Sequence, residues 1–593
     1  MTFTELAHHF RTIEETASRL LMTRELSDLF KKSHRDEIAC IIYLLQGRVS
    51  PAYEKIDFGM AEKMLIRASI HALNIEKKTF LDRYKKVGDL GKTVEVFRDK
   101  ITTIEEETLS VREVFDKLKK MAQANGEGSQ EVKIGILSQL IRTLDSLSCR
   151  YLMRIPVNTL RLGFSDMTIL DAFSWMIVGD KTLRGKIEEA YHVRPDLGFI
   201  GTALKKEGIQ GLKKVKPAVF TPILMMRAER LSSAKDIIEK IGRCAVESKY
   251  DGFRLQIHYK NDEVKLFSRN LDEVSYMYPD LVSAILKNIK ATEVIYEGEA
   301  IGYNPKTGDF LPFQETVQRK RKYHIAQKAK EIPLKLFVFD LLYLDGENML
   351  VQQFFNRRKF LSHIFKNNAA AGSLILMADE EIIDDPQRLE ALFEKAVSKG
   401  LEGIIAKKLN GVYRAGAREW NWIKYKKSYS SKLQDTIDCL VMGYDFGKGK
   451  RTDFGIGAFL VGVYDEKKDM FVTVAKIGTG LTDEEWRTLE IKNQKLKIKN
   501  RPSNYVVDKG MECDVWLHPK TIVEIRADEI TKSPVHTAGR VMKKTKTGKG
   551  EEIDIPGFAL RFPRLERFRE DKKPEDATSV KEIETMYKQQ KIA

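Results

Sequence analysis

The chain has 593 residues, of which 42% are hydrophobic and 31% charged, a composition typical of a multidomain globular protein. Lysine and arginine outnumber aspartate and glutamate by 101 to 85, so the formal net charge is +16. Such an excess favours a polyanionic partner, with nucleic acid first; a charge that serves solubility alone is the alternative.

The five cysteines are scattered, and none forms a Cys-x-x-Cys pair. This spacing argues against a zinc cluster and against a disulfide framework. The sequence contains no signal peptide and no apolar run of about 18 residues. We therefore expect a cytoplasmic protein with no membrane association.

Residues 1–215 are predicted to form an all-α domain. Apolar residues recur at three- and four-residue steps, for example over 4–21, 105–122 and 131–147. The segment 160–165 is a basic loop ahead of a helix that Ser165 could cap. Backbone N–H groups at such a helix start, with Arg161 beside them, could hold a phosphate, although an ordinary connection between helices is the alternative.

The pattern changes after Pro217 and Pro222, and residues 216–428 are predicted to form an α+β domain. A helix is expected over 385–399. Short strands are expected over 255–259, 264–268, 294–299, 336–339 and 403–407.

Residues 429–593 are predicted to form a small β-barrel. Strands over 438–444, 458–464 and 521–526 alternate with loops rich in glycine and lysine. The OB fold is the natural candidate in a basic protein. A C-terminal helix over 579–590 should begin with a capping box formed by Ser579 and Glu582.

Lys249 is the first candidate for chemistry. A hydrophobic strand leads into it, and Asp251 and Gly252 indicate the turn that ends the strand. Burial or nearby cations can lower the pKa of a lysine and free its amine as a nucleophile. Gly252 would permit the close approach of a ligand. An exposed turn with a solvated lysine is the alternative.

Acidic residues on two later strands are candidates for binding a metal. Strand alternation places Glu297 and Glu299 on one face, where two carboxylates suit a hard cation such as Mg²⁺; a solvated edge strand is the alternative. Strict alternation also places Glu402 and Lys407 on opposite faces of the next candidate strand. Both could serve one site only if that strand is bulged or ends early.

Basic residues in two further segments indicate phosphate binding. Lys424 and Lys426 share a strand face with Trp422, and Arg418 lies just upstream. Two ammonium groups on one face repel each other, so an anionic ligand explains them better than a basic edge strand that merely discourages aggregation. Residues 561–572 contain five cations and suggest a nucleic-acid or pyrophosphate contact, with a solvated charge run as the alternative.

In their order, these segments resemble the motifs of ATP-dependent DNA ligases of the archaeal and eukaryotic type, which belong to the covalent nucleotidyltransferase superfamily. The likeness covers nearly the whole chain, and the ordered set is far more specific than any single motif. The matching segments are Lys249-Tyr250-Asp251-Gly252-Phe253-Arg254, Phe267-Ser268-Arg269-Asn270, Glu297-Gly298-Glu299, Phe337-Val338-Phe339-Asp340, Glu402-Gly403-Ile404-Ile405-Ala406-Lys407, Trp422-Ile423-Lys424-Tyr425-Lys426 and Arg569-Glu570-Asp571-Lys572.

The resemblance implies a helical DNA-binding domain, an adenylation domain and an OB-fold domain. It implies nick sealing in double-stranded DNA, in replication, repair and recombination, through three steps. Lys249 takes AMP from ATP and releases pyrophosphate, the AMP passes to the 5′-phosphate at the nick, and the 3′-hydroxyl then displaces AMP. Mg²⁺, with Mn²⁺ as an alternative, is the implied metal.

The resemblance also implies a role for each matching residue. Around the nucleotide, Glu247 would bind the adenine amino group, Phe339 would stack on the ring, and Arg254 and Arg269 would hold ribose and phosphates. The remaining roles are metal and sugar contacts by Glu299 and Glu402, α-phosphate contacts by Arg418, Lys424 and Lys426, pyrophosphate orientation by Arg569, Asp571 and Lys572, and DNA-backbone contacts by Arg161 and Gly163.

Several points stay open at the level of sequence. Many members of the family carry aspartate where Glu297 stands, which leaves its role undecided. A sliding clamp is a further candidate partner, but the helical domain lacks a clear clamp-binding peptide, and Gln352-Gln353-Phe354-Phe355 is interpreted as packing. We expect a monomer. An RNA ligase, a capping guanylyltransferase and a catalytically silent scaffold are the competing readings, and GTP, ADP or NAD⁺ could also serve as nucleotide donor.

Overall fold

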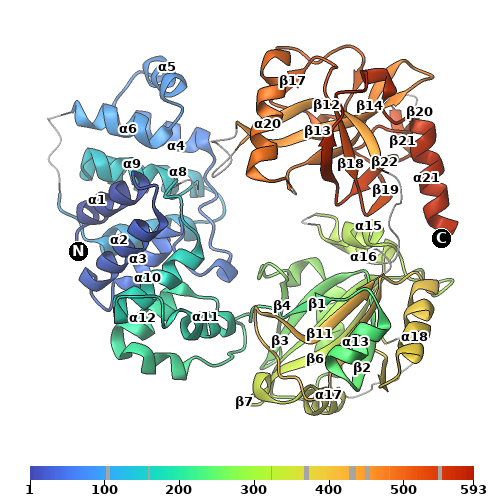
Figure 1. Ribbon diagram of the computed structural model, residues 1–593. Helices are drawn as coiled ribbons and strands as arrows, with labels where there is room; N and C mark the ends of the chain where they lie inside the picture. The colour runs from blue at the N-terminus through green and yellow to red at the C-terminus, as the bar shows by residue number, and fades with distance from the viewer. Residues whose placement is uncertain are drawn as a thin grey trace. The chain divides into compact units, whose positions relative to one another are not determined.

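The computed structural model describes residues 1–101, 107–157, 160–321, 323–365, 373–426, 436–447, 455–479, 481–544 and 551–592. It divides into two compact units, residues 1–425 and 426–593, each described by itself below (Figure 1). The expected domain boundary at 428/429 lies outside the described residues. Among the described helices, none is both long and apolar enough to cross a membrane.

The described residues among the first 214 form helices around one hydrophobic core, which includes Phe3, Phe30, Leu118 and Phe173. The helices are α1 (Phe3–Glu14), α2 (Arg19–Lys32), α3 (Ile38–Leu45), α4 (Glu62–Leu73), α5 (Lys77–Val87), α6 (Leu90–Asp99), α7 (Val111–Gln123), α8 (Ser129–Thr143), α9 (Ser146–Arg154), α10 (Asp166–Val178), α11 (Arg184–Val193) and α12 (Leu197–Glu207), with short 3-10 turns at Ala52–Glu54 and Gly208–Lys214.

Two of the predicted helices are each divided in the structure, because a polar side chain starts a new helix within the apolar pattern. Ser18 caps α2 inside the predicted helix 4–21, and Asp145 caps α9 inside the predicted helix 131–147. The third, 105–122, begins partly outside the described residues. The described helix α7 starts at Val111, behind a capping box of Ser110 and Glu113.

The central region contains two sheets that carry the segments of interest (Figure 1). The five-stranded sheet has the order β1 (Arg227–Arg230), β11 (Arg418–Lys426), β10 (Gly403–Lys408), β2 (Cys244–Lys249) and β9 (Glu380–Ile383). The six-stranded sheet has the order β4 (Glu263–Ser268), β3 (Phe253–Lys260), β5 (Glu293–Gly302), β6 (Leu334–Leu344) and β7 (Glu347–Asn348), with β8 (Ile375–Met377) beside β6.

Helices cover these sheets and complete the central region. The apolar sides of α13 (Ala234–Ile241) and α18 (Pro386–Ser398) pack together and against the five-stranded sheet. The other helices are α14 (Pro279–Asn288), α15 (Phe313–Thr316), α16 (Ile325–Glu331) and α17 (Phe354–His363), with 3-10 turns at Ser275–Met277, Val317–Arg319 and Met349–Val351. The prediction that this region combines helices and strands in an α+β fold is confirmed.

The second unit is rich in strands, as predicted. Its main sheet has the order β15 (Lys497–Ile498), β17 (Val515–Leu517), β12 (Ile437–Phe446), β13 (Ile456–Asp465), β14 (Met470–Ile477) and β16 (Tyr505–Val506). Strand β18 (Ile522–Arg526) joins β12 to β23 (Arg564–Phe568). The described strands also include two pairs: β19 (Glu529–Ser533) with β22 (Gly557–Arg561), and β20 (Val541–Lys544) with β21 (Glu551–Ile555).

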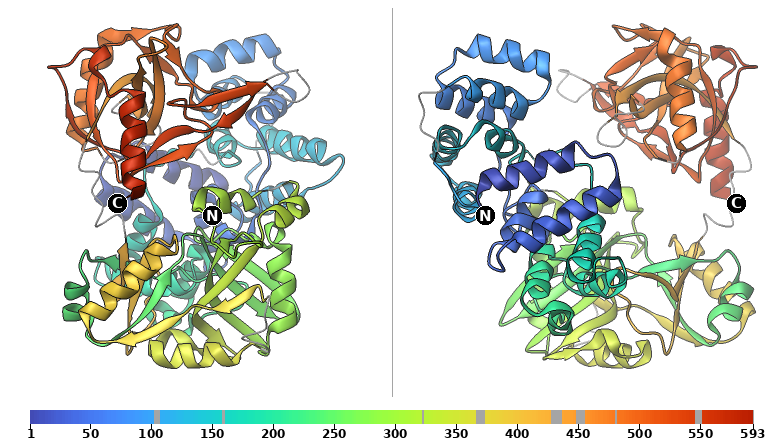
Figure 2. Two further views of the ribbon diagram at one scale, coloured as in Figure 1. Left: turned by 90° about the vertical axis from the view of Figure 1, so that its right-hand side faces the viewer. Right: turned by 60° about the vertical axis from the view of Figure 1, so that its left-hand side comes forward.

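Among the described residues of this unit, two α-helices pack on the strands. α20 (Asp483–Asn493) starts at a capping box of Thr482 and Glu485, and 3-10 turns follow at Gln494–Leu496, Lys509–Met511 and Pro574–Asp576. α21 (Val580–Ile592) packs against β13 and β19 (Figure 2). The predicted capping box is present, because the Ser579 N–H donates to Glu582 and the Glu582 N–H donates to Ser579 Oγ.

Candidate active site

Lys249 is the last residue of β2, and its ammonium group contacts a carboxylate oxygen of Glu402. The side chain is 22% exposed, so a small molecule can reach it. The bend after it contains Gly252, where an added Cβ would lie 2.1 Å from the Ala300 carbonyl oxygen. A close approach to the backbone of β5 therefore requires glycine at this position, whereas the predicted approach of a ligand stays a prediction.

The charges around Lys249 correct another expectation. Burial opposes protonation of its amine, but Glu402, Glu299 and Asp251 together outweigh burial and raise the pKa of Lys249 above its usual value. Glu299 is affected in turn: burial raises its pKa to about 7, even though Lys249 and Arg254 favour its ionised form. Without a nucleotide, this lysine is held as a cation among acids.

The position of Glu402 explains how Glu402 and Lys407 can serve one site, although strict alternation would place them on opposite faces of a strand. β10 begins only at Gly403, whose φ of +145° breaks the extended geometry, so Glu402 lies before the strand. Its backbone N–H donates to the Lys249 carbonyl oxygen over 3.1 Å. On the strand itself, Gly403, Ile405 and Lys407 lie opposite Lys249, Glu247 and Ala245, so Lys407 shares the face of Glu247 and Lys249.

A group of buried polar and aromatic side chains, called the pocket below, lies along the same face of β2. Glu247 is 3% exposed, and its Oε2 lies 2.6 Å from the ammonium nitrogen of Lys407, whereas its Oε1 is buried and has no hydrogen-bond partner among the described residues. Phe339 from β6 and Trp422 from β11 pack edge to face beside it, with ring centroids 6.0 Å apart. The pocket therefore combines an aromatic ring with an available buried acceptor.

Arg254 lies beside this pocket and forms an ion pair with Glu297. One Arg254 nitrogen lies 2.5 Å from Glu297 Oε2 and another donates to the Met226 carbonyl oxygen over 2.8 Å. The Tyr413 hydroxyl donates to the same Glu297 oxygen, while Gln256 Nε2 donates to the other. The fully buried Glu297 is thus committed to positioning Arg254, which leaves Glu299 as the acid of that strand nearest Lys249.

The remaining predicted nucleotide residues occupy the edge of this region. Arg269 is exposed in the turn after β4, and Arg418 is exposed at the start of β11. Lys424 and Lys426 are half-buried and alternate with the buried Ile423 and Tyr425. Tyr425 stacks on Phe393 of α18, on the opposite face of the sheet, so Lys424 lies on the face of Trp422.

Arg569, Asp571 and Lys572 belong to the second unit, where they form one charged network. Arg569 lies 2.7 Å from Asp571 and 3.2 Å from Asp438 at the start of β12, and the Lys572 ammonium lies 2.6 Å from Asp438. The bond to Asp571, together with Asp438 and Glu524, raises the pKa of Arg569. The contacts that hold these three residues together all come from residues of the second unit.

In the helical region, Arg161 and Gly163 both adopt left-handed backbone conformations in the loop before α10, with φ of +59° and +75°. Arg161 is exposed, and its guanidinium lies 3.1 Å from Asp89, the residue that caps α6. Ser165 occupies the N-cap position of α10 in extended conformation, but its side chain makes no capping hydrogen bond, contrary to the sequence expectation.

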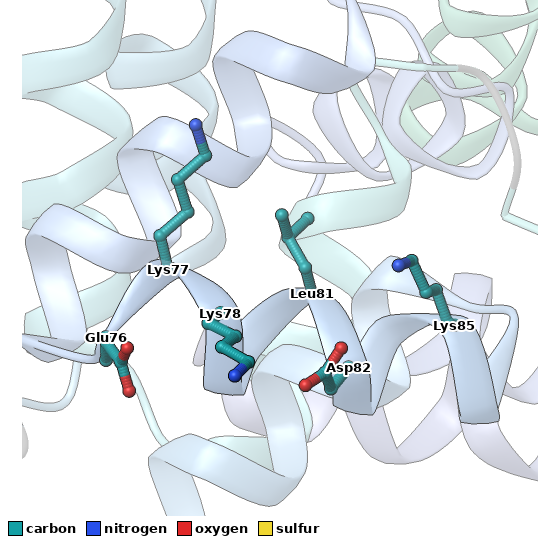
Figure 3. Close-up of a pocket in the computed structure, with 6 residues that line it drawn as sticks. All are labelled: Glu76, Lys77, Lys78, Leu81, Asp82 and Lys85. Carbon is teal, nitrogen blue, oxygen red and sulfur yellow. The ribbon is translucent and has the colours of Figure 1, made fainter.

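Two further features of the described residues concern ligand binding by their chemistry: the arrangement of metal-binding side chains and a surface hollow. Within the described ranges, no group of three or more histidine, cysteine, aspartate or glutamate side chains is arranged to hold a metal. A hollow of about 530 Å³ lies along the largely exposed helix α5 and is lined by Glu76, Lys77, Lys78, Leu81, Asp82 and Lys85 (Figure 3). Its lining is charged and open, and it includes none of the predicted catalytic residues.

Sequence reasoning missed two contributors to the pocket. Lys407 was considered only for its strand face, and Tyr413, which bonds to Glu297, lies outside every motif. A hydrophobic strand that ends in a buried lysine was the available signal for Lys407, because a lysine there requires a partner. No comparable signal marks Tyr413. The segment 352–355 is only partly packing: Phe354 is buried, but Phe355 is 54% exposed.

Comparison with known families defines the class of protein. Three family models match in order: "DNA ligase N terminus" over residues 2–174, "ATP dependent DNA ligase domain" over 225–426 and "ATP dependent DNA ligase C terminal region" over 452–572. These three models cover most of the helical region, the central region from residue 225 and most of the strand-rich unit. The fold and the matches together define a multidomain, ATP-dependent ligase.

Similar curated proteins extend this match over the whole chain. A protein described as a probable DNA ligase of Dictyoglomus thermophilum is 48% identical over 592 residues, covering 100% of this chain and 98% of its own. The DNA ligase of Pyrobaculum islandicum is 40% identical, with coverages of 100% and 99%. The chain belongs to the ATP-dependent DNA ligase family.

A solved structure titled Pmar-Lig_PreS3 shares the fold. It aligns with 95% of this chain and 99% of its own at a TM-score of 0.54 and 18% identity. At this identity the likeness concerns the fold alone.

Proposed function

We propose that this protein seals nicks in double-stranded DNA through a covalent lysyl-adenylate formed on Lys249. The observation that carries the proposal is the place of Lys249: it ends β2 between Glu402 and Glu299, on the face that also holds the buried pocket of Glu247 and Phe339. A nucleophile, an acid pair and an aromatic side chain beside a buried acceptor are what nucleotidyl transfer to an enzyme requires.

In the first step the Lys249 amine attacks the α-phosphorus of ATP, a new N–P bond forms, and the bond to the β-phosphate breaks to release pyrophosphate. The amine must lose a proton first, and Glu402, already in contact with it, is placed to accept that proton. The AMP is then transferred to the 5′-phosphate at the nick. Attack by the 3′-hydroxyl forms the phosphodiester bond and releases AMP.

Glu299 and Glu402 fit a divalent cation, and we propose Mg²⁺ with Mn²⁺ as an alternative. Two carboxylates are too few for an all-protein site, but Mg²⁺ is typically held by one or two carboxylates together with substrate phosphates and water. When bound, the cation would neutralise charge on the phosphates. ATP and metal would therefore share one site.

The surrounding residues are assigned by position. Glu247 would accept a hydrogen bond from the adenine amino group, Phe339 would stack on the base, and Arg254 and Arg269 would contact ribose and phosphate. Arg418, Lys424 and Lys426 would neutralise the α-phosphate. The half-buried position of Lys424 on the face of Trp422 supports this assignment.

For the other regions we propose domains at 1–215, 216–428 and 429–593, the last with an OB fold. Arg569, Asp571 and Lys572 would orient the leaving pyrophosphate, and Arg161 and Gly163 would contact the DNA backbone. The protein would act as a cytoplasmic monomer in replication, repair and recombination. The net charge of +16 supports a DNA partner that is bound largely through its phosphates.

The test is intact mass after incubation with Mg²⁺ and, separately, ATP, GTP or NAD⁺. We expect a gain of one AMP from ATP that disappears on addition of nicked DNA. Lys249→Ala should show no gain while binding nicked DNA with unchanged affinity. Adenylated Lys249→Ala protein would contradict the assignment of the nucleophile, and a gain of GMP would indicate a capping activity instead.

A further inference from the structure

The side chain of Lys407 is 1% exposed, and the proposed function gives its ammonium group no role. It contacts Glu247 Oε2 at 2.6 Å and donates a hydrogen bond to the Phe339 carbonyl oxygen over 3.2 Å. Three rings surround it, with its nitrogen 4.7–4.8 Å from the centroids of Phe339, Phe354 and Trp422. A buried lysine is costly, so a cage this complete calls for an explanation.

The effect of Lys407 on Glu247 differs between the two carboxylate oxygens. Oε2 is engaged by the ammonium group, whereas Oε1 is buried without a hydrogen bond, and the nearest Arg358 nitrogen lies 3.8 Å away. The neighbouring Glu380, opposite Glu247 on β9, adds a like charge and is itself 3.3 Å from Arg358. Lys407 is therefore the close cation that fixes which oxygen of Glu247 faces the pocket.

We propose that Lys407 is a positioning residue for nucleotide selection, because it holds one oxygen of Glu247 and presents the other as a hydrogen-bond acceptor to an exocyclic amino group of the base. This inference rests on the proposed function. An ionised carboxylate can only accept, so it pairs with the 6-amino group of adenine and opposes the 6-oxo group of guanine. A site built to bond an N–H group rejects a ligand that lacks it far more strongly than an apolar pocket does.

The neutral variant Lys407→Met removes the cation and keeps most of the side-chain volume. Burial raises the pKa of Glu247, and Lys407 is the largest influence that lowers it, so the carboxyl of this variant is expected to take up a proton. A protonated carboxyl can donate as well as accept, so the distinction between the two bases is weakened. The preference for ATP over GTP should fall by roughly 30- to 100-fold.

The experiment measures kcat/KM for covalent nucleotide transfer to the enzyme with ATP, GTP and purine riboside triphosphate, which lacks the 6-amino group. For Lys407→Met, we expect the loss with ATP to exceed the loss with purine riboside triphosphate by the same factor, mainly through KM. Lys407→Arg should restore most of the preference. The matched control is Lys408→Met, the next residue on the other face of β10, which should keep the wild-type ratios.

Equal losses with all three nucleotides would overturn the proposal, because they would show that Lys407 only supports the fold of the pocket. If Lys407→Met does not fold, Lys407→Gln provides a neutral donor and should show a smaller fall in the ATP preference; an unchanged ratio in that variant would also overturn it. Failure of the wild-type enzyme to form any enzyme–AMP would instead contradict the proposed function.

Discussion

Glu297 shows how one buried residue can serve a site without touching its reacting atoms. Its carboxylate is fully buried, and it receives hydrogen bonds from Arg254, Tyr413 and Gln256. The strand alternation predicts that Glu297 and Glu299 share a face, and both act on Arg254. The sequence could not divide their roles, because that division depends on Gln256 in β3 and on Tyr413 in the loop between β10 and β11.

Replacing Glu297 by glutamine should therefore destabilise the protein. The shape is kept, but Arg254 loses the partner that compensates its buried charge, which typically costs about 3–5 kcal/mol. We expect a lower urea midpoint and a higher KM for ATP. The control is Glu293→Gln on the same strand, whose partner Lys260 is 46% exposed and whose loss should cost less than about 1 kcal/mol. Equal midpoints for the two variants would contradict this role.

His258 provides the pH-dependent prediction at this scale. Burial, followed by the charge of Lys265, lowers the pKa of His258 to about 3 from an ordinary 6.5. Its Nδ1 accepts the Phe220 N–H, and its other nitrogen lies 3.0 Å from Gln256 Oε1, so the neutral ring is matched to its surroundings. Since the unfolded chain binds a proton below pH 6.5 and the folded one does not, stability should fall as pH drops from 6.5 towards 3.

At pH 5 this linkage should lower the free energy of unfolding by roughly 2 kcal/mol relative to pH 7. Denaturant titration of wild type and His258→Asn at both pH values measures it, because asparagine still offers an oxygen to Phe220 but does not titrate. The exposed His324→Asn serves as control and should keep the wild-type difference. A wild-type difference that persists in His258→Asn would assign the effect to other groups.

At the scale of elements, periodicity predicted where the strands of the central region lie, but not where they break. The expected strands over 255–259, 264–268 and 403–407 lie within β3, β4 and β10. The break that turns Glu402 toward Lys249 arises from the conformation of Gly403, which alternation cannot reveal. Likewise, the need for Gly252 comes from β5, a strand about fifty residues away in the chain.

The close approach at Gly252 yields a test of this geometry. In Gly252→Ala, the added methyl group would overlap the Ala300 carbonyl oxygen, so β3 and β5 must separate and Lys249 must move. We expect a loss of about 1–3 kcal/mol and a strong fall in adenylation. Gly135→Ala is the control, because the added methyl in α8 meets open space and should stabilise the helix by about 0.5–1 kcal/mol. Wild-type adenylation in Gly252→Ala would contradict the argument.

At the scale of the whole molecule, the sequence predicted the succession of a helical, a mixed and a strand-rich region, because hydrophobic periodicity changes along the chain. The family matches follow the same succession. The C-terminal network around Asp438 could not be predicted, since Asp438 precedes its partners by more than 130 residues and carries no motif. In this network, Arg569 is organised by its own unit and does not depend on a nucleotide for its position.

The division of labour between the units can be tested with Arg569→Ala. If Arg569 orients the leaving pyrophosphate, the variant should slow self-adenylation by at least about 10-fold but seal a pre-adenylated nick, where AMP and not pyrophosphate is the leaving group, at a nearly normal rate. Single-turnover assays with ATP and with pre-adenylated DNA measure the two steps. Arg526→Ala, which removes an exposed pair with Glu566 in the same unit, is the control. Equal losses in both assays would refute the assignment.

Lys249 on β2 and Lys407 on β10 lie on the same face of the sheet but differ in exposure, so a reagent that reacts with amines can distinguish them. Lys249 is 22% exposed, whereas Lys407 is enclosed by three rings at 1% exposure. An adenosine carrying an amine-directed electrophile at its 5′ position would therefore reach Lys249 and not Lys407, at a pH high enough to free the Lys249 amine. Such a reagent would count functional sites in a preparation, and it offers a route to covalent inhibitors that are selective within a chain containing many surface lysines.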